Sequence, residues 1–203
     1  RGDGAQGLVF TAGVVARSRG KGVGQQIIEK KLSIKGACEM RFEQHLTREL
    51  LTSMREAGCL KIVFGLESFN QRVMDFMKKG IKQEWVRRIA DDCIDLGIAL
   101  HCYIIVGFPT EKEEEARETM NFIVENERLH GLYGFSCQPC LFDLEKEAPI
   151  MSDPGSYGIR RIMRPSAEDL SLGFLYEVSE GMTPDEADRL YQPVYDKVSE
   201  VVC

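Results

Sequence analysis

The sequence has no long hydrophobic run, no recognisable signal peptide and no excess of basic residues. No apolar run approaches the roughly 20 residues that span a bilayer, so we predict no membrane segment and expect a cytoplasmic protein. With 26 Lys and Arg against 32 Asp and Glu, the formal net charge is −6 and the pI is about 5.3. This balance does not attract phosphate backbones or anionic lipids, so neither nucleic acid nor a membrane is favoured as a partner.

Several motifs of known chemistry are also missing. The sequence has no Ser/His/Asp order, no P-loop and no EF-hand pattern, so nothing in it supports a hydrolase, a kinase or a calcium sensor. Its seven cysteines are an odd number, which suits reduced, mostly buried thiols better than a disulfide framework. The one close pair, Cys137 and Cys140, lacks a second pair to complete four ligands, so we predict no metal site.

What is present is a regular alternation of apolar runs and helix-like segments. Of the 203 residues, 43% are hydrophobic and 29% are charged, which is typical of a globular chain. The alternation predicts an α/β fold with a parallel sheet and right-handed crossovers, with too few strands for a closed eight-stranded barrel. The strand candidates are residues 7–11, 32–41, 59–66, 98–106 and 133–142. The helix candidates are residues 48–57, 71–78, 83–96 and 111–129.

From residue 145 onward the pattern changes. Pro149, Pro154 and Pro165 with nearby glycines predict an irregular connection, after which residues 167–180 and 184–201 look helical. Thr183 followed by Pro184 is typical of a helix start. We therefore expect a division into residues 1–144, a sheet-forming part, and residues 145–203, an irregular connection with a helical extension.

Two of the apolar runs end abruptly in glycine and a carboxylate. The first is Val63-Phe64-Gly65-Leu66-Glu67-Ser68, and the second is Ile105-Val106-Gly107-Phe108-Pro109-Thr110-Glu111. In parallel α/β folds, ligand chemistry gathers at the carboxyl ends of the strands. These two strand ends are therefore candidate parts of a ligand site.

These motifs closely resemble the radical S-adenosylmethionine (SAM) superfamily. The resemblance is strongest over residues 32–125, where it includes Met54-Arg55-Glu56-Ala57-Gly58 and Met77-Lys78-Lys79-Gly80, and it implies the later strands of a partial (β/α) barrel of the TIM-barrel type. The tail, with Tyr157-Gly158-Ile159, looks like members that carry a cobalamin-binding domain upstream. The resemblance therefore implies SAM, a [4Fe-4S] cluster and, in that subgroup, cobalamin as cofactors.

In this family the cluster passes an electron to SAM, and the 5′-deoxyadenosyl radical that results abstracts hydrogen from a substrate. The CxxxCxxC segment that holds the cluster is absent from this sequence. We expect that the chain is a fragment whose cluster segment lies upstream, so that it is inactive alone; decay of the motif is the alternative, and Gly22-Val23-Gly24 favours it. The resemblance further implies a small-molecule or peptide substrate and a reductant protein as partners.

Six residues are implied as SAM contacts. Glu67 would accept hydrogen bonds from the ribose or amino group, Ser68 would supply a hydroxyl beside it, and Arg41 would pair with the carboxylate. Ile105 would lie against adenine, Gly107 would allow close backbone approach, and Thr11 falls where the family contacts the methionyl amino group, although the usual acidic residue is missing. No catalytic residue is assigned.

Structural roles remain open for several of these residues. The Glu67 carboxylate could interact favourably with the dipole at a helix N-terminus. Arg41 could form a surface salt bridge, and Ile105 could be a residue of the hydrophobic core. We expect Glu111 to cap the following helix and Lys79 to hold the last carbonyls of its own helix. Two other functions remain: a decayed, non-catalytic barrel used for interactions, and an aldolase-like (β/α) barrel, although no lysine lies at the mouth of a confident strand. The substrate and the reaction type are not encoded in any readable motif.

Overall fold

The computed structural model describes residues 35–126, 135–163 and 173–192. Their contacts divide the chain into two compact units. Unit 1 comprises Arg1–Leu66, Ile81–Tyr103 and Asn126–Gln138, and unit 2 comprises Glu67–Gly80, Ile104–Glu125 and Pro139–Cys203. Each unit is described by itself. The strand predicted at residues 7–11 and the contact predicted for Thr11 lie outside the described residues.

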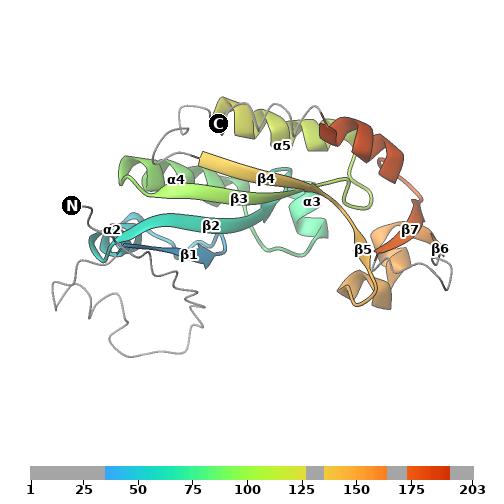
Figure 1. Cartoon of the computed structure of the whole chain (residues 1–203), viewed down its shortest axis with the longest axis horizontal. Coiled ribbons are helices and arrows are strands. Elements are labelled where there is room, and N and C mark those ends of the chain that lie inside the picture. The colour runs from blue at the N-terminus through green and yellow to red at the C-terminus, as the bar shows by residue number, and fades with distance from the viewer. Residues whose placement is uncertain (1–34, 127–134, 164–172, 193–203) are drawn as a thin grey trace, which may run out of the picture. The chain divides into compact units, whose positions relative to one another are not determined.

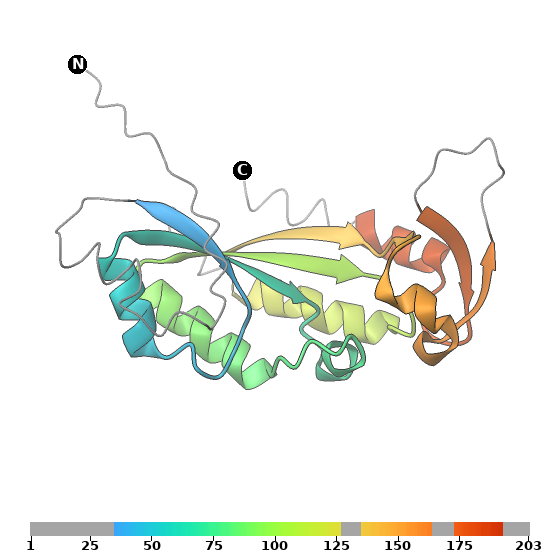
Figure 2. The same cartoon turned by 90° about the horizontal axis from the view of Figure 1, so that it is seen from below.

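Four strands form one sheet in the order β1-β2-β3-β4 (Figure 1). Strands β1 and β2 pair in parallel, with Met40 opposite Phe64, and Figure 2 shows the arrows of β2, β3 and β4 running in one direction. The predicted α/β fold with a parallel sheet and partial-barrel architecture is confirmed. The strands are β1 (Gly36–Met40), β2 (Cys59–Glu67), β3 (Ala99–Val106) and β4 (Phe135–Leu141).

Unit 1 packs helices α2 (Arg48–Glu56) and α4 (Gln83–Asp95) against the strands. Figure 2 shows both helices on one side of β1 and β2. Burial alternates along β2, since Ile62, Phe64 and Leu66 are fully buried while Val63 and Gly65 between them are partly exposed. Because successive strand residues face opposite sides, the helices cover one face of these strands and leave the other partly open.

Helix α2 has ordinary capping chemistry at both ends. The Thr47 hydroxyl accepts a hydrogen bond from Leu50 N, which caps α2 at its first turn. After α2, Gly58 adopts a φ of 95°, a left-handed conformation that ends the helix. Leu51 buries the inner face of α2, and Ile89 and Cys93 bury that of α4.

Unit 2 has a second sheet that the sequence did not suggest. Strands β5 (Leu144–Glu145), β7 (Gly173–Val178) and β6 (Ile159–Met163) pair antiparallel in that order, and two short 3-10 helices lie between β5 and β6. Helix α3 (Gln71–Phe76), helix α5 (Glu113–Glu125) and a helix at residues 184–192 complete the unit. No helix within the described ranges is long and apolar enough to cross a membrane.

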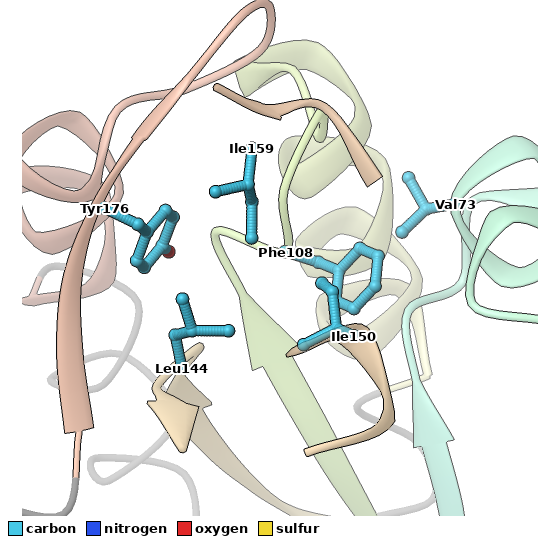
Figure 3. Packing of buried hydrophobic residues seen from close by; sticks show 6 residues of the cluster. All are labelled: Val73, Phe108, Leu144, Ile150, Ile159 and Tyr176. Carbon is cyan, nitrogen blue, oxygen red and sulfur yellow. The ribbon is translucent and has the colours of Figure 1, made fainter. Parts of the chain in front are cut away.

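The core of unit 2 joins these elements. Figure 3 shows its six buried side chains, which face a common interior between the strands and turns. Rings extend this core, with Phe108 edge-on to Phe142 and Phe142 edge-on to Tyr176. Burial raises the pKa of Tyr176 to about 12. The six residues are Val73, Phe108, Leu144, Ile150, Ile159 and Tyr176.

The predicted helix at residues 167–180 is wrong for residues 173–178, which form β7. The segment is rich in aromatic and β-branched residues, and it gains a partner on each side, β5 and β6, that the sequence alone did not reveal. The helix after Thr183 is confirmed over residues 184–192. There the Glu186 carboxylate accepts from Thr183 N while Thr183 Oγ1 accepts from Glu186 N, forming a capping box.

Candidate functional site

The predicted ligand residues lie at the carboxyl ends of three neighbouring strands. Arg41 directly follows β1, Glu67 is the last residue of β2, and Ile105 and Gly107 lie at the end of β3. Arg41 belongs to unit 1 and the others belong to unit 2. Their convergence on one SAM molecule therefore stays a prediction.

Unit 1 has an open pocket of about 420 Å³ beside Arg41. A volume of this size accommodates a small molecule or one end of a larger one. The strand residues among its walls, such as Val63 and Tyr103, alternate with residues that face the helices, so the pocket lies on the sheet face opposite α2 and α4. Its walls are Glu39, Met40, Arg41, Glu43, His45, Leu46, Val63, Gly65 and Tyr103.

The middle of the pocket is formed by a glycine and an aromatic ring. Gly65 adds no side chain to the centre of the strand face, while Tyr103 on the next strand is 40% exposed. His101 supports Tyr103 edge-on at a centroid distance of 5.3 Å. Burial, with a smaller contribution from Lys61, lowers the pKa of His101, which favours the neutral ring. The pocket therefore offers the exposed ring of Tyr103 on β3, and Gly65 on β2 leaves space beside it.

The charges around the pocket are of both signs. Arg41 supplies a guanidinium, and Glu39 and Glu43 supply carboxylates. Glu43 lies 3.0 Å from His45 Nε2. A ligand that carries an ammonium and a carboxylate, as an amino acid does, finds groups of opposite charge for both. This is the chemistry of the methionyl end of SAM.

In unit 2, Glu67 is held by Lys79. The Lys79 ammonium lies 2.8 Å from Glu67 Oε1, and the Glu67 side chain is 14% exposed. Lys78 and Gly80 take left-handed conformations after α3, and the predicted contact of Lys79 with the carbonyls of its own helix stays a prediction beside this ion pair. Glu67 itself has a φ of 66°, unusual for a residue with a side chain.

The Ser68 hydroxyl is engaged inside unit 2. Ser68 is fully buried, its Oγ lies 3.1 Å from Thr119 Oγ1, and it accepts a hydrogen bond from Asn70 N. Thr119 also accepts from Phe69 N at 2.9 Å. These bonds join the residues after β2 to helix α5. They show Ser68 as a residue that positions the turn after Glu67, while its contact with SAM stays a prediction.

Gly107 serves packing in unit 2. At a φ of 80°, a Cβ added to Gly107 would stand 2.4 Å from Ala187 Cβ, so the close approach that glycine permits is to the helix at residues 184–192. Ile105, two residues earlier, is half-buried and packs on the core cluster. The structural alternative for Ile105 is thus supported, and its adenine contact stays a prediction.

Glu111 is a buried carboxyl that sequence reasoning assigned to the helix cap. It is 1% exposed, and its Oε2 accepts a hydrogen bond from Gly107 N at 2.8 Å. Burial raises the pKa of Glu111 to about 7. The cap prediction is wrong, because the Lys112 amide at the start of α5 donates to Glu115 instead. Through its hydrogen bond with Gly107, Glu111 fixes the turn after β3. The one sequence signal for this role was that Glu111 lies four residues after Gly107.

Arg72 is a second residue that the sequence did not single out. Its guanidinium makes two hydrogen bonds to the Glu115 carboxylate and one of 2.8 Å to the Thr110 carbonyl oxygen. Thr110 has a φ of 73°, a strained conformation for a β-branched residue. Arg72 therefore ties helix α3 to the turn after β3 and to helix α5.

No metal centre is visible in the part of the chain that the structure describes. Within residues 35–126, 135–163 and 173–192, no three His, Cys, Asp or Glu side chains form a group that could hold an ion. Cys140 is an exposed, free thiol whose Sγ lies 3.3 Å from the Ile104 carbonyl oxygen. These residues do not fit a [4Fe-4S] cluster, which needs several converging thiolates.

Comparison with known proteins finds a family match for about half of the chain. Residues 24–123 match the family model described as the radical SAM superfamily. An uncharacterised methyltransferase of Pyrococcus horikoshii is 33% identical over 70 residues, 34% of this chain and 15% of that protein. The tRNA-2-methylthio-N(6)-dimethylallyladenosine synthase of Helicobacter pylori strain 26695 is 33% identical over 123 residues, 56% of this chain and 28% of that protein. The chain thus spans less than a third of these relatives.

Solved structures agree on the fold. OxsB, described as a cobalamin-dependent S-adenosylmethionine radical enzyme, superposes with a TM-score of 0.61 at 15% identity, over 83% of this chain and 29% of that one. TsrM of Kitasatospora setae, described as a radical S-adenosylmethionine methyltransferase, gives a TM-score of 0.56 at 16% identity, over 83% of this chain and 34% of that one. At such identities the likeness shows the fold alone.

Proposed function

Because residues 24–123 match the family model of the radical SAM superfamily, we propose that this chain supplies part of the SAM site and the substrate-facing wall of a radical SAM enzyme. The observation that carries the proposal is the position of Arg41, at the carboxyl end of β1 and in the wall of an open pocket. Ligands of parallel α/β folds bind at this end of the strands. The chain spans less than a third of the two curated relatives, so the activity of the whole enzyme belongs to the proposal.

The roles of the proposed contacts follow from their chemistry. Arg41 pairs with the SAM carboxylate through charge-assisted hydrogen bonds, and a carboxylate of the same pocket, Glu39 or Glu43, receives the ammonium. Glu67 accepts hydrogen bonds from the ribose hydroxyls, with Lys79 holding its carboxylate in place. Ser68 and Gly107 keep the two neighbouring turns in shape. Tyr103 offers its ring to the substrate.

The cluster belongs to a segment outside the described residues. When bound, the cluster and SAM together supply the 5′-deoxyadenosyl radical that takes hydrogen from the substrate. The residues of this chain bind, orient and shield; they do not deliver the electron. A reductant protein and a small-molecule or peptide substrate complete the proposal.

The reaction type is the finer part of the proposal. The two curated relatives named above are a methyltransferase and a methylthiotransferase-type tRNA synthase, so transfer of a one-carbon or methylthio group is favoured over the other reactions of the family. Cobalamin use rests on the resemblance of the tail around Tyr157 and Gly158, with the cobalamin domain placed outside this chain.

Titration of the purified chain with SAM tests the site. We expect saturable binding by calorimetry, weakened about 10- to 100-fold by Arg41→Met, because a hydrogen bond to a charged group contributes about 1.5–3 kcal/mol. As a matched control, Arg117→Met changes a surface guanidinium that pairs within helix α5 and leaves affinity unchanged.

A second ligand separates the carboxylate contact from a loss of folding. 5′-Methylthioadenosine lacks the amino and carboxylate groups, so Arg41→Met should leave its affinity unchanged while weakening SAM. Equal weakening of both ligands, or no SAM binding by the wild-type chain, contradicts the proposal.

A further inference from the structure

Two cysteines of unit 1 lie side by side on paired strands, away from the pocket. Cys38 is in β1, and Cys59 begins β2. In the parallel register, Cys59 lies opposite Gly36, and Cys38, two residues further along β1, lies opposite Ile62, because the register shifts by one residue, Leu60 of β2, between these pairs. Residues two apart on a strand face the same side, so Cys38 and Cys59 share a face. Gly36 has no side chain of its own to stand between them.

The two thiols are neighbours and are only partly covered. They lie close enough for each to change the pKa of the other. Both residues are free cysteines of intermediate exposure, whereas Cys93 on helix α4, on the same side, is fully buried. A small oxidant therefore reaches Cys38 and Cys59 but not Cys93.

The surroundings make the two sulfurs unequal. The interaction with Cys38, helped by the charge of Arg55, lowers the pKa of the Cys59 thiol. The same interaction, with burial, raises the pKa of Cys38. When Cys59 is protonated, its thiol lies 3.6 Å from the Lys61 carbonyl oxygen. Thiolates and not thiols are the nucleophiles, and sensitive cysteines combine a favoured thiolate, exposure and a nearby second thiol.

We propose that Cys38 and Cys59 form an oxidation-sensitive dithiol, a modification site in which Cys59 is the reactive cysteine and Cys38 the resolving one. The oxidant class is a hydroperoxide, and the product is a reversible Cys38–Cys59 disulfide. This site is separate from the proposed SAM contacts and does not depend on them.

The chemistry balances with hydrogen peroxide as the oxidant. The Cys59 thiolate attacks one peroxide oxygen, the O–O bond breaks, and hydroxide leaves and becomes water on taking up a proton. Cys59 is then a sulfenic acid. The Cys38 thiol attacks the sulfenic sulfur, its proton goes to the departing oxygen, and a second water leaves as the S–S bond forms. The two thiols are oxidised by two electrons, and the peroxide is reduced to two waters.

Peptide mapping of the reduced, full chain tests the proposal without any variant. Trypsin places Cys38 in the peptide 36–41, Cys59 in the peptide 56–61 and Cys93 in the peptide 89–112. After brief hydrogen peroxide treatment and alkylation of the remaining thiols, we expect the 36–41 and 56–61 peptides joined, at two hydrogens less than their sum, and separated by dithiothreitol. The same treatment in urea should give no preference for this pair.

Two variants and a rate measurement identify the roles. In Cys38→Ser, the sulfenic acid on Cys59 has no resolving thiol and should be captured by dimedone, whereas Cys59→Ser should give no dimedone label on Cys38. Iodoacetamide should modify Cys59 at least about tenfold faster than Cys140 near pH 7, since burial raises the pKa of the Cys140 thiol. Cys140→Ser is the matched control, and it should leave the 36–41/56–61 cross-link unchanged.

The proposal is overturned if native wild-type chain gives no such cross-link, or gives it no faster than a disulfide that involves Cys140. It is also overturned if Cys59 and Cys140 are alkylated at equal rates. A dimedone label on Cys38 in Cys59→Ser would reverse the assigned roles. None of these outcomes depends on SAM binding, so they are distinguishable from a failure of the proposed function.

Discussion

The guanidinium of Arg72 lies 2.8 Å from the carbonyl oxygen of Thr110, a residue held at a φ of 73°. One turn of helix α3 thus fixes the most strained non-glycine residue of the turn after β3. The same guanidinium donates a hydrogen bond to the Glu115 carboxylate at the start of α5. The turn between β3 and α5 is therefore fixed by Arg72, which joins it to helix α3 and to the first turn of helix α5.

Replacing Arg72 with Met should lower the free energy of unfolding by about 2–3 kcal/mol, because hydrogen bonds to a charged group are lost and Thr110 is left strained. Urea titration measures the loss. Arg117→Met is the matched control, since Arg117 pairs with Glu113 one turn earlier on the exposed helix surface, and it should cost less than about 0.5 kcal/mol. Equal losses for the two variants would show that the clamp does not stabilise the turn.

Glu111 should make stability depend on pH. Its pKa rises to about 7 in the folded chain, above that of an unfolded glutamate. The carboxyl is therefore protonated when folded and ionised when unfolded between about pH 4.5 and 7, so its contribution is present at low pH and is lost as pH rises toward 7. We expect the stability difference between wild type and Glu111→Gln to shift by roughly 3 kcal/mol over this range.

Urea titrations of both chains at several pH values measure this difference. Because every other carboxylate is common to the two proteins, their titration cancels in the comparison. A pH-independent difference would show that Glu111 stays ionised when buried.

Gly107→Ala should destabilise unit 2 through two separable effects, a clash with Ala187 and the strain of a φ of 80°. Gly80→Ala is the matched control, because Gly80 has a φ of 65° but nothing within 4 Å of an added Cβ. We expect Gly80→Ala to cost about 1–2 kcal/mol and Gly107→Ala clearly more. Adding Ala187→Gly should recover the excess, and a double-mutant cycle by thermal unfolding checks it. Additive losses would rule out the clash.

Anaerobic treatment of the chain with iron and sulfide should give no stable [4Fe-4S] absorbance. The described cysteines do not converge into a group of ligands, and such clusters need several thiolates. With dithionite and SAM, no 5′-deoxyadenosine should form, whereas a chain extended upstream by a CxxxCxxC segment should give both signals. Cluster formation that disappears in Cys137→Ala or Cys140→Ala would promote that pair to ligands.

Local rules predicted unit 1 well. Helix α2 was predicted at residues 48–57 and is found at Arg48–Glu56, because a capping threonine, a one-sided apolar stripe and a terminal glycine all agree. The parallel strands and their carboxyl-terminal polar residues followed from apolar runs that end in Gly and Glu. The positions of Glu67 and Gly107 at strand ends were predicted from these runs, and that of Arg41 from the strand candidate at residues 32–41.

Contacts between distant residues account for what the sequence analysis missed. Residues 173–178 took a strand conformation because β5 and β6 pair with them, and the ion pair between Lys79 and Glu67 joins residues twelve positions apart. Glu111 was predicted to cap a helix. Its burial could not be predicted from neighbouring residues, because the turn that contains it is covered by residues about 70 positions later. Spacing predicts local hydrogen bonds but not which surface a later segment will cover.

The residues that pack on the turn after β3 also determine where the polypeptide can be truncated without exposing that turn. An added Cβ at Gly158 would stand 2.5 Å from Thr110, one at Gly181 would meet its carbonyl carbon at 2.5 Å, and Met182 N donates to the Glu111 carbonyl oxygen at 2.7 Å. Truncation at residue 144 removes all three neighbours and leaves buried polar groups of the turn open to water. A recombinant piece that keeps this turn intact must therefore extend through residue 187, and the tail is an integral part of the domain's folding unit.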